Sequence, residues 1–161
     1  MASPRGREPR SARGGPRPGV VCRVAHDGDT FAVQQAALKL AAELGFARRC
    51  AVEIAIVASE LTSNILKYGA SGSVALDPVD DTRRGPGLRI TARDQGPPFV
   101  DFERALRDGC DAAGRLEPSA FAGRRGIGSG LGAVRRFSDD LGWSPEPGGK
   151  RVWAVRYRGR P

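Results

Sequence analysis

The spacing of apolar residues over positions 20–158 predicts alternating strands and helices within one folded domain. Apolar residues at every second position predict strands at 20–25, 73–76 and 88–93, and a C-terminal hairpin of Trp143 and 151–157 around 147–149. Helical spacing predicts helices at 30–44, 47–68, 101–107 and 131–140. These elements fit an α/β (α+β) two-layer sandwich, in which a mixed, mostly antiparallel sheet is covered on one face by helices.

The boundaries of these elements carry predictions of their own. Asp29 or Thr30 is expected to cap the first helix, and Gly45 is expected to end it. A polar loop is expected at 77–87, between the second and third strands. The long helix is expected to bury an apolar stripe made of Val52, Ala55, Ile56, Leu61 and Ile65.

The end of the long helix carries three polar residues on one line. Glu60, Asn64 and Lys67 stand at positions i, i+4 and i+7, which brings their side chains to one helix face. A metal-bound triphosphate needs such a set: a carboxylate that acts as a base or orients water, an oxygen ligand for Mg²⁺, and a cation for phosphate. A solvated helix face often carries the same residue types, so this pattern needs support from elsewhere in the chain.

A second candidate site follows the strand at 88–93. Asp94 stands at the end of an alternating apolar run, where its carboxylate can accept a hydrogen bond from an exocyclic amine such as that of adenine. Gly96 lets the backbone turn close to a ring.

A glycine-rich segment at 126–132 leads directly into an apolar-periodic helix. Free backbone N–H groups and the dipole at such a helix N-terminus suit phosphate. The segment is not a Walker loop, because no Lys-Ser or Lys-Thr follows its glycines.

Glu-x-x-x-Asn, Asp-x-Gly and Gly-x-Gly-x-Gly-Leu-Gly, in this order, resemble the three boxes of the GHKL ATPase superfamily. Their compact form resembles the anti-sigma-factor serine/threonine kinases of bacterial partner-switching systems. The resemblance covers residues 20–158 and implies the Bergerat ATP-binding fold, with ATP and Mg²⁺ as cofactors. It implies that Glu60 is the catalytic base, that Asn64 holds Mg²⁺, and that Asp94, with Gly96 beside it, reads the adenine amine. It further implies that the phosphates are bound by Lys67, Gly126, Gly128, Gly130, Leu131 and Gly132.

Two features depart from the family pattern. Pro98 stands where the family usually has glycine, and its fixed φ and missing N–H predict a stiffer loop. The segment at 110–125 is longer than the most compact members need and is expected to form a mobile lid over the nucleotide. Arg124 and Arg125 could steady the γ-phosphate or a partner, although an exposed arginine pair is more often only a solvated surface.

Composition restricts the class of protein. The 161 residues are 40% hydrophobic, enough for one domain with a core, and no apolar stretch approaches the ~20 residues of a membrane-spanning helix. No apolar segment suggests a secretory signal, so the cytoplasm is the expected location. Cys22, Cys50 and Cys110 are widely spaced, which favours reduced thiols over a disulfide framework or a zinc site. His26 is the only histidine, which argues against a His-dependent triad, and we expect it on the surface at a strand end.

Residues 1–19 differ from the rest of the chain in composition. They hold five arginines and one glutamate among prolines and glycines, so they supply half of the formal net charge of +8. We expect a disordered basic tail, because so few apolar residues cannot order a segment. Such a tail could bind nucleic acid or simply aid solubility. No aromatic platform accompanies it, which argues against nucleic-acid binding.

By this resemblance the protein is expected to be an ATP-dependent serine/threonine kinase that phosphorylates a STAS-type antagonist protein. A sigma factor or a phosphatase is a further candidate partner, and homodimer formation is left open. One alternative is a non-catalytic ATP-binding switch that binds a sigma factor or a phosphatase. Another is the catalytic fragment of a histidine kinase, since residues 64–68 also resemble the first box of those enzymes. No room for a dimerising helical hairpin is visible, which argues against that second alternative.

Overall fold

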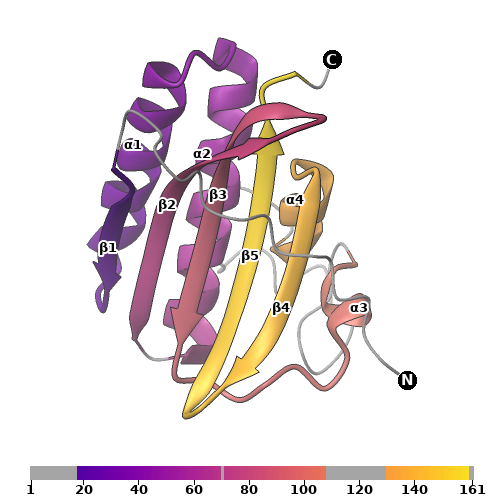
Figure 1. Ribbon diagram of the computed structural model, residues 1–161. Coiled ribbons are helices and arrows are strands. Elements are labelled where there is room, and N and C mark those ends of the chain that lie inside the picture. Colours follow the sequence, from indigo (N-terminus) through magenta and orange to yellow (C-terminus); the bar gives the residue numbers. More distant parts are fainter. Residues whose placement is uncertain (1–17, 70, 108–129, 160–161) are drawn as a thin grey trace.

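The computed structural model describes residues 18–69, 71–107 and 130–159, which form one sheet with helices beside it (Figure 1). The strands are β1 (Val20–Val24), β2 (Gly72–Asp81), β3 (Gly85–Asp94), β4 (Asp140–Glu146) and β5 (Gly149–Tyr157). The helices are α1 (Gly28–Glu43), α2 (Arg48–Asn64), α3 (Phe102–Ala105) and α4 (Leu131–Arg136). A π-helical turn, η1 (Ile65–Gly69), continues α2.

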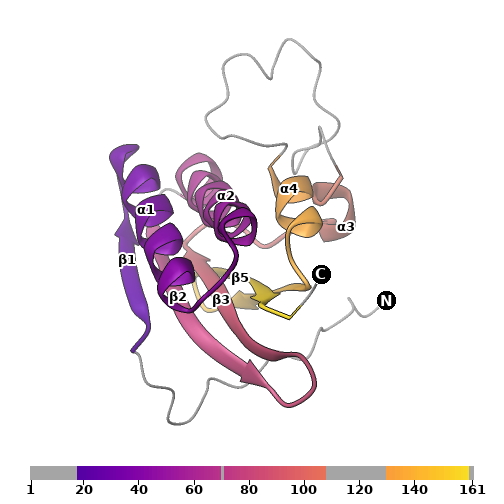
Figure 2. The same ribbon diagram turned by 90° about the horizontal axis from the view of Figure 1, so that it is seen from above.

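The five strands lie in the order β1-β2-β3-β5-β4, and every neighbouring pair is antiparallel. Strand β3 is therefore central, between β2 and β5. Seen from above, α1, α2 and α4 lie on the same face of this sheet (Figure 2). The predicted two-layer α+β sandwich is confirmed.

The main core lies between the sheet and helices α1 and α2. Alternate residues of β3 face the helices, and Leu88, Ile90 and Ala92 are buried there. Helix α2 contributes Ile54 and Leu61 to the same cluster. Each fully buried aliphatic side chain stabilises the fold by roughly 1.5–3 kcal/mol, so this interface fixes α2 against β3.

The predicted polar loop at 77–87 is wrong. Strands β2 and β3 continue through most of it as one long hairpin, in which Asp81 pairs with Gly85. The Asp81 carboxylate accepts hydrogen bonds from the backbone N–H groups of Arg83 and Arg84, and these bonds hold the turn. Gly85 follows with a φ of 73°, which favours glycine. The sequence did not predict this hairpin, because its charged residues are also typical of exposed loops.

The predicted helices need small corrections. In the predicted stripe of α2, Ala55, Leu61 and Ile65 are buried as expected, whereas Val52 is 45% exposed and Ile54, not predicted, is buried. Helix α1 starts at Gly28, and Asp29 does not cap its first turn; its carboxylate instead accepts from the N–H groups of Ala25 and His26. Helix α4 ends at Arg136, earlier than expected, because β4 already begins at Asp140. Gly45, with a φ of 79°, follows the end of α1 as predicted.

Several predictions fall outside the described residues, namely those for the basic tail up to residue 17, the 110–125 lid and Cys110. Cys22 and Cys50 are free, partly buried thiols, and His26 is exposed just after β1. None of the described helices is long and apolar enough to cross a membrane.

Candidate functional site

Helix α2 changes character toward its C-terminal end. Its last two turns bury a run of polar residues, Ser59, Glu60, Thr62 and Ser63. Thr62 donates its hydroxyl hydrogen to the carbonyl of Ala58 at 2.7 Å, which satisfies one of these groups within the helix. The chain then widens into the π-helical turn η1, a feature that occurs often at functional sites.

The three predicted polar residues of α2 and η1 differ in burial. Glu60 is 1% exposed and has a partner. Asn64 is the last residue of α2, and its Nδ2 atom is buried with no hydrogen-bond partner in the part of the chain that the structure describes. Lys67 lies in η1 and is exposed, with an interaction of its own. The helix therefore presents a buried carboxylate, an unsatisfied amide and an exposed ammonium in succession.

Asp94 is the last residue of β3, and its side chain is only 6% exposed. Its Oδ1 atom accepts hydrogen bonds from the backbone N–H of Gly96 at 2.7 Å and from the Lys150 ammonium at 2.9 Å. No described residue donates to Oδ2. One oxygen of this buried carboxylate is thus fully used, and the other remains able to accept a hydrogen bond.

Two glycines let η1 and the end of β3 approach each other. A Cβ on Gly69 would lie 2.6 Å from Cγ of Asp94, so η1 packs directly on this carboxylate. A Cβ on Gly96 would lie 2.5 Å from the carbonyl oxygen of Tyr68 and 2.9 Å from Nζ of Lys150. The first two sequence boxes, more than twenty residues apart, are therefore in contact in space.

Lys150 is the residue that the sequence did not reveal. It is the second residue of β5 and lies directly across from Asp94 in the β3–β5 pairing. Its side chain is 7% exposed, and Nζ also lies 5.5 Å from the centre of the Phe99 ring. Nothing near Lys150 in the sequence marks it, because its partner is 56 residues away.

The third box is described only in part. Gly130 precedes α4 with a φ of 69°, and Leu131 and Gly132 are buried in the first turn of that helix. No side chain caps this end of α4, and the helix packs against α2. Gly126, Gly128, Arg124 and Arg125 lie outside the described residues.

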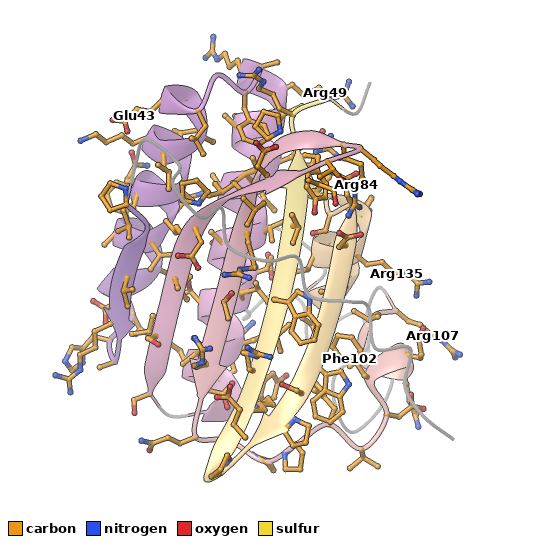
Figure 3. The ribbon with its side chains drawn as sticks, in the orientation of Figure 1. Glu43, Arg49, Arg84, Phe102, Arg107 and Arg135 are labelled. Carbon is orange, nitrogen blue, oxygen red and sulfur yellow. The ribbon has the colours of Figure 1, made fainter. Side chains whose placement is uncertain are left out.

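A hollow elsewhere on the surface is separate from these residues. It is lined by residues of α3, α4 and β4, including Trp143. Phe102 and Arg135, which also line it, are labelled in Figure 3. None of the predicted site residues lines it. The candidate site is therefore defined by the Asp94 carboxylate, whose Oδ2 has no donor among the described residues, and by Nδ2 of Asn64, and not by this hollow.

The profile of the histidine kinase-like ATPase domain matches residues 24–156. The chain belongs to this family. Serine/threonine-protein kinase RsbT of Bacillus subtilis (strain 168) is a family relative in sequence, 31% identical over 136 residues, which make up 84% of this chain and 93% of RsbT. The resemblance to GHKL domains of the anti-sigma-factor kinase group is thereby confirmed, and the family supports the use of ATP.

Two solved structures share the fold of this family member. The RsbU and RsbW domains of Rv1364c from Mycobacterium tuberculosis superpose with a TM-score of 0.60 at 16% identity, over 91% of this chain and 34% of that one. The SiaB–SiaC complex from Pseudomonas aeruginosa gives a TM-score of 0.54 at 18% identity, over 85% of this chain and 89% of that one. This chain thus spans about a third of the first structure and most of the second.

Proposed function

We propose that the protein is an ATP-dependent serine/threonine kinase that phosphorylates a STAS-type antagonist protein in a partner-switching pathway. Membership of an ATPase-domain family supports ATP binding, and 31% identity to a serine/threonine-protein kinase supports phosphoryl transfer. The observation that carries the proposal is the buried carboxylate of Asp94, one oxygen of which has no donor among the described residues where η1 meets β3.

In this proposal Asp94 reads the adenine base. Its free Oδ2 atom is an acceptor, and the exocyclic amine of adenine is a donor, whereas guanine carries a carbonyl oxygen at that ring position. A carboxylate therefore favours adenine over guanine. Gly96 has no side chain, which lets the carbonyl of Tyr68 and the ammonium of Lys150 approach the loop beside Asp94.

The residues near the end of α2 fit a magnesium triphosphate. Asn64 is proposed to bind Mg²⁺ through its amide oxygen, since Mg²⁺ commonly takes one or two protein oxygens together with phosphate oxygens. Its Nδ2 atom, which is buried without a partner among the described residues, is a donor and suits a phosphate oxygen instead. Among the described residues, no group of three or more His, Cys, Asp or Glu side chains could hold a metal ion. When bound, Mg²⁺ neutralises charge that develops on the phosphate oxygens. Lys67 and the glycines at 126–132 are proposed to contact those phosphates.

Glu60 is proposed as the catalytic base. In that role its carboxylate accepts the proton of the attacking serine or threonine hydroxyl while the hydroxyl oxygen bonds to the γ-phosphorus, and ADP leaves. Glu60 is 1% exposed, so the hydroxyl would have to reach it from the nucleotide side.

The proposed protein substrate is a STAS domain with its acceptor hydroxyl at a helix N-terminus. A phosphate added there changes the charge by about −2, which alters every contact of that surface. A sigma factor or a phosphatase would be the partner released or bound as a result.

Calorimetric titration of Asp94→Asn with Mg-ATP tests base recognition. We expect affinity to fall more than tenfold, since losing a hydrogen bond to a charged acceptor costs about 1.5–3 kcal/mol. Asp140→Asn is the matched control, because Asp140 also pairs with a cation but at the opposite end of the sheet. Equal ATP affinity in Asp94→Asn and the wild type would contradict the adenine assignment.

Incubation with labelled ATP and each candidate STAS domain of the host tests the reaction itself. We expect label on a serine or threonine of one such domain. Retained ATP binding with no labelled domain would replace the kinase by the non-catalytic switch. The deep burial of Glu60 is the observation that favours this second function, because a base must reach its substrate.

A further inference from the structure

The ion pair between Lys150 and Asp94 lies almost entirely inside the protein. The two side chains are 7% and 6% exposed, and their charged atoms are 2.9 Å apart. They are direct cross-strand neighbours on β5 and β3. The face of Phe99, 5.5 Å from Nζ, gives the ammonium a second favourable contact.

Both donors around Asp94 select the same oxygen. Nζ of Lys150 and the N–H of Gly96 both bind Oδ1, at 2.9 Å and 2.7 Å. Two donors on one oxygen oppose rotation about the Cβ–Cγ bond, so the plane of the carboxylate is held. The opposite oxygen, Oδ2, keeps its acceptor capacity unused by the described residues.

Stability alone does not account for a lysine at this position. Burying two charges costs about as much free energy as their attraction returns, and well-packed hydrophobic residues often stabilise a protein equally well. Asp94 without Lys150 would however be a lone buried charge, which is strongly unfavourable. A functional role of the Asp94 carboxylate would therefore explain the ion pair, whereas stability does not.

We propose that Lys150 is a positioning residue for base recognition, which holds Oδ1 of Asp94 so that the charged Oδ2 faces the exocyclic amine of adenine. This inference rests on the proposed ATP site, and it extends that site to a residue outside the three sequence boxes. Loss of Lys150 should then weaken the preference for a 6-amino purine, and not only the affinity for nucleotide.

Calorimetric titrations with ATP and with purine riboside triphosphate, which lacks the 6-amino group, measure this preference directly. We expect the wild type to bind ATP at least tenfold more tightly than the analogue, by the free energy of one charged hydrogen bond. In Lys150→Met the ratio of the two affinities should approach one, because ATP binding weakens and analogue binding does not. Lys150→Arg, which keeps the cation, should retain most of the ratio.

Arg156→Met is the matched control. Arg156 lies on the same strand and pairs with Glu53 of α2 at 3.1 Å, but at the opposite end of β5. It should lower the melting temperature and leave the ratio of affinities unchanged. A wild-type ratio in Lys150→Met, or an equal loss for both nucleotides, would overturn the role of Lys150. A wild type without any preference would overturn the adenine assignment together with it.

A measurement on the wild type covers the case in which Lys150→Met does not fold. In protein labelled with ¹⁵N-lysine, the buried ammonium of Lys150 should give a resonance protected from exchange. Its chemical shift should move on addition of ATP and move less with the analogue that lacks the amine. Equal shifts with both nucleotides would contradict the inference.

Discussion

The two ends of the sheet differ in how completely their buried carboxylates are hydrogen-bonded. At the end that holds the β2–β3 turn, Arg84 binds both carboxylate oxygens of Asp140 at 2.8 Å, and Tyr157 lies against both residues. At the other end, Asp94 meets Lys150 through one oxygen only. Figure 3 shows Arg84 together with Arg49, near the start of α2, at the first end, and Phe102 toward the second.

The end near Arg84, the saturated end, has more of its charged groups paired, although Nε of Arg156 is buried there without a hydrogen-bond partner among the described residues. Asp139 accepts the backbone N–H of Tyr157 at 2.7 Å, and Arg156 binds Glu53 at 3.1 Å, so side chains close the ends of β5 and tie it to α2. At the end near Asp94, the amide of Asn64 and one oxygen of Asp94 have no described partner. Saturated groups hold a structure together, whereas unsatisfied buried groups leave free energy to be recovered by a ligand.

The largest expected effect is a loss of turnover when Glu60 is changed. Glu60→Gln should retain nucleotide and lose turnover by roughly 10²–10⁴-fold, as expected for a general base. Glu53→Gln is the control on the same helix, since Glu53 belongs to the saturated end. Single-turnover phosphoryl transfer, measured with a cognate protein substrate, gives the comparison. Wild-type turnover in Glu60→Gln would remove Glu60 from the reaction.

Arg156→Met should produce the largest loss of stability. It removes the more buried of the two cations of Glu53, whose side chain is 14% exposed and keeps, among the described residues, only its ion pair with the exposed Arg49. The cost should therefore stay below the roughly 3–5 kcal/mol of a buried charge left with no partner. Urea denaturation should show this loss, and ATP affinity of the folded protein should stay unchanged. A change in ATP affinity without a change in stability would contradict the view that Arg156 stabilises the fold and takes no part in nucleotide binding.

The buried phenol of Tyr157 should make the free energy of unfolding depend on pH in alkali. Burial raises the pKa of Tyr157 from 10.0 to about 12, and the nearby Arg84 guanidinium opposes this shift. Between these values the unfolded tyrosine ionises first, so the free energy of unfolding should fall as the pH rises from 10 to 12. Tyr157→Phe should remove about 1–2 kcal/mol of this decline. Parallel pH profiles for both proteins would refute the assignment.

The smallest effect is expected at Asp29, in the first turn of α1, whose Oδ2 accepts two backbone hydrogen bonds. Hydrogen bonds from the backbone N–H groups of Ala25 and His26 lower the pKa of Asp29 below 3.8. Its contribution to stability is present above pH 3.8 and is lost as the pH falls through the lowered value. Asp29→Asn should therefore melt slightly earlier at pH 6 and approach the wild type in acid, with ATP affinity unchanged. A constant difference at all pH values would show that ionisation plays no part.

Periodicity located most elements but not all their lengths. Apolar alternation found the strands that face the helices, because burial on one face forces a period of two. The same signal failed at 77–87, where hairpin residues carry charge although they are paired. It also could not reveal the π-helical turn at 65–69, since an α-helix and a π-helix differ in hydrogen bonding and not in residue type.

The sequence by itself determined the family and the residues of the three boxes, because a nucleotide site needs particular residue types at short, fixed spacings. Tertiary structure alone decided that Lys150 lies across from Asp94, that Gly69 packs on the Asp94 carboxylate, and that Oδ2 has no donor among the described residues. Strand register brings together residues 56 positions apart, and no local pattern records that pairing. The sequence therefore predicts which residues form the site, whereas the orientation of the Asp94 carboxylate follows only from the packing of β3, β5 and η1.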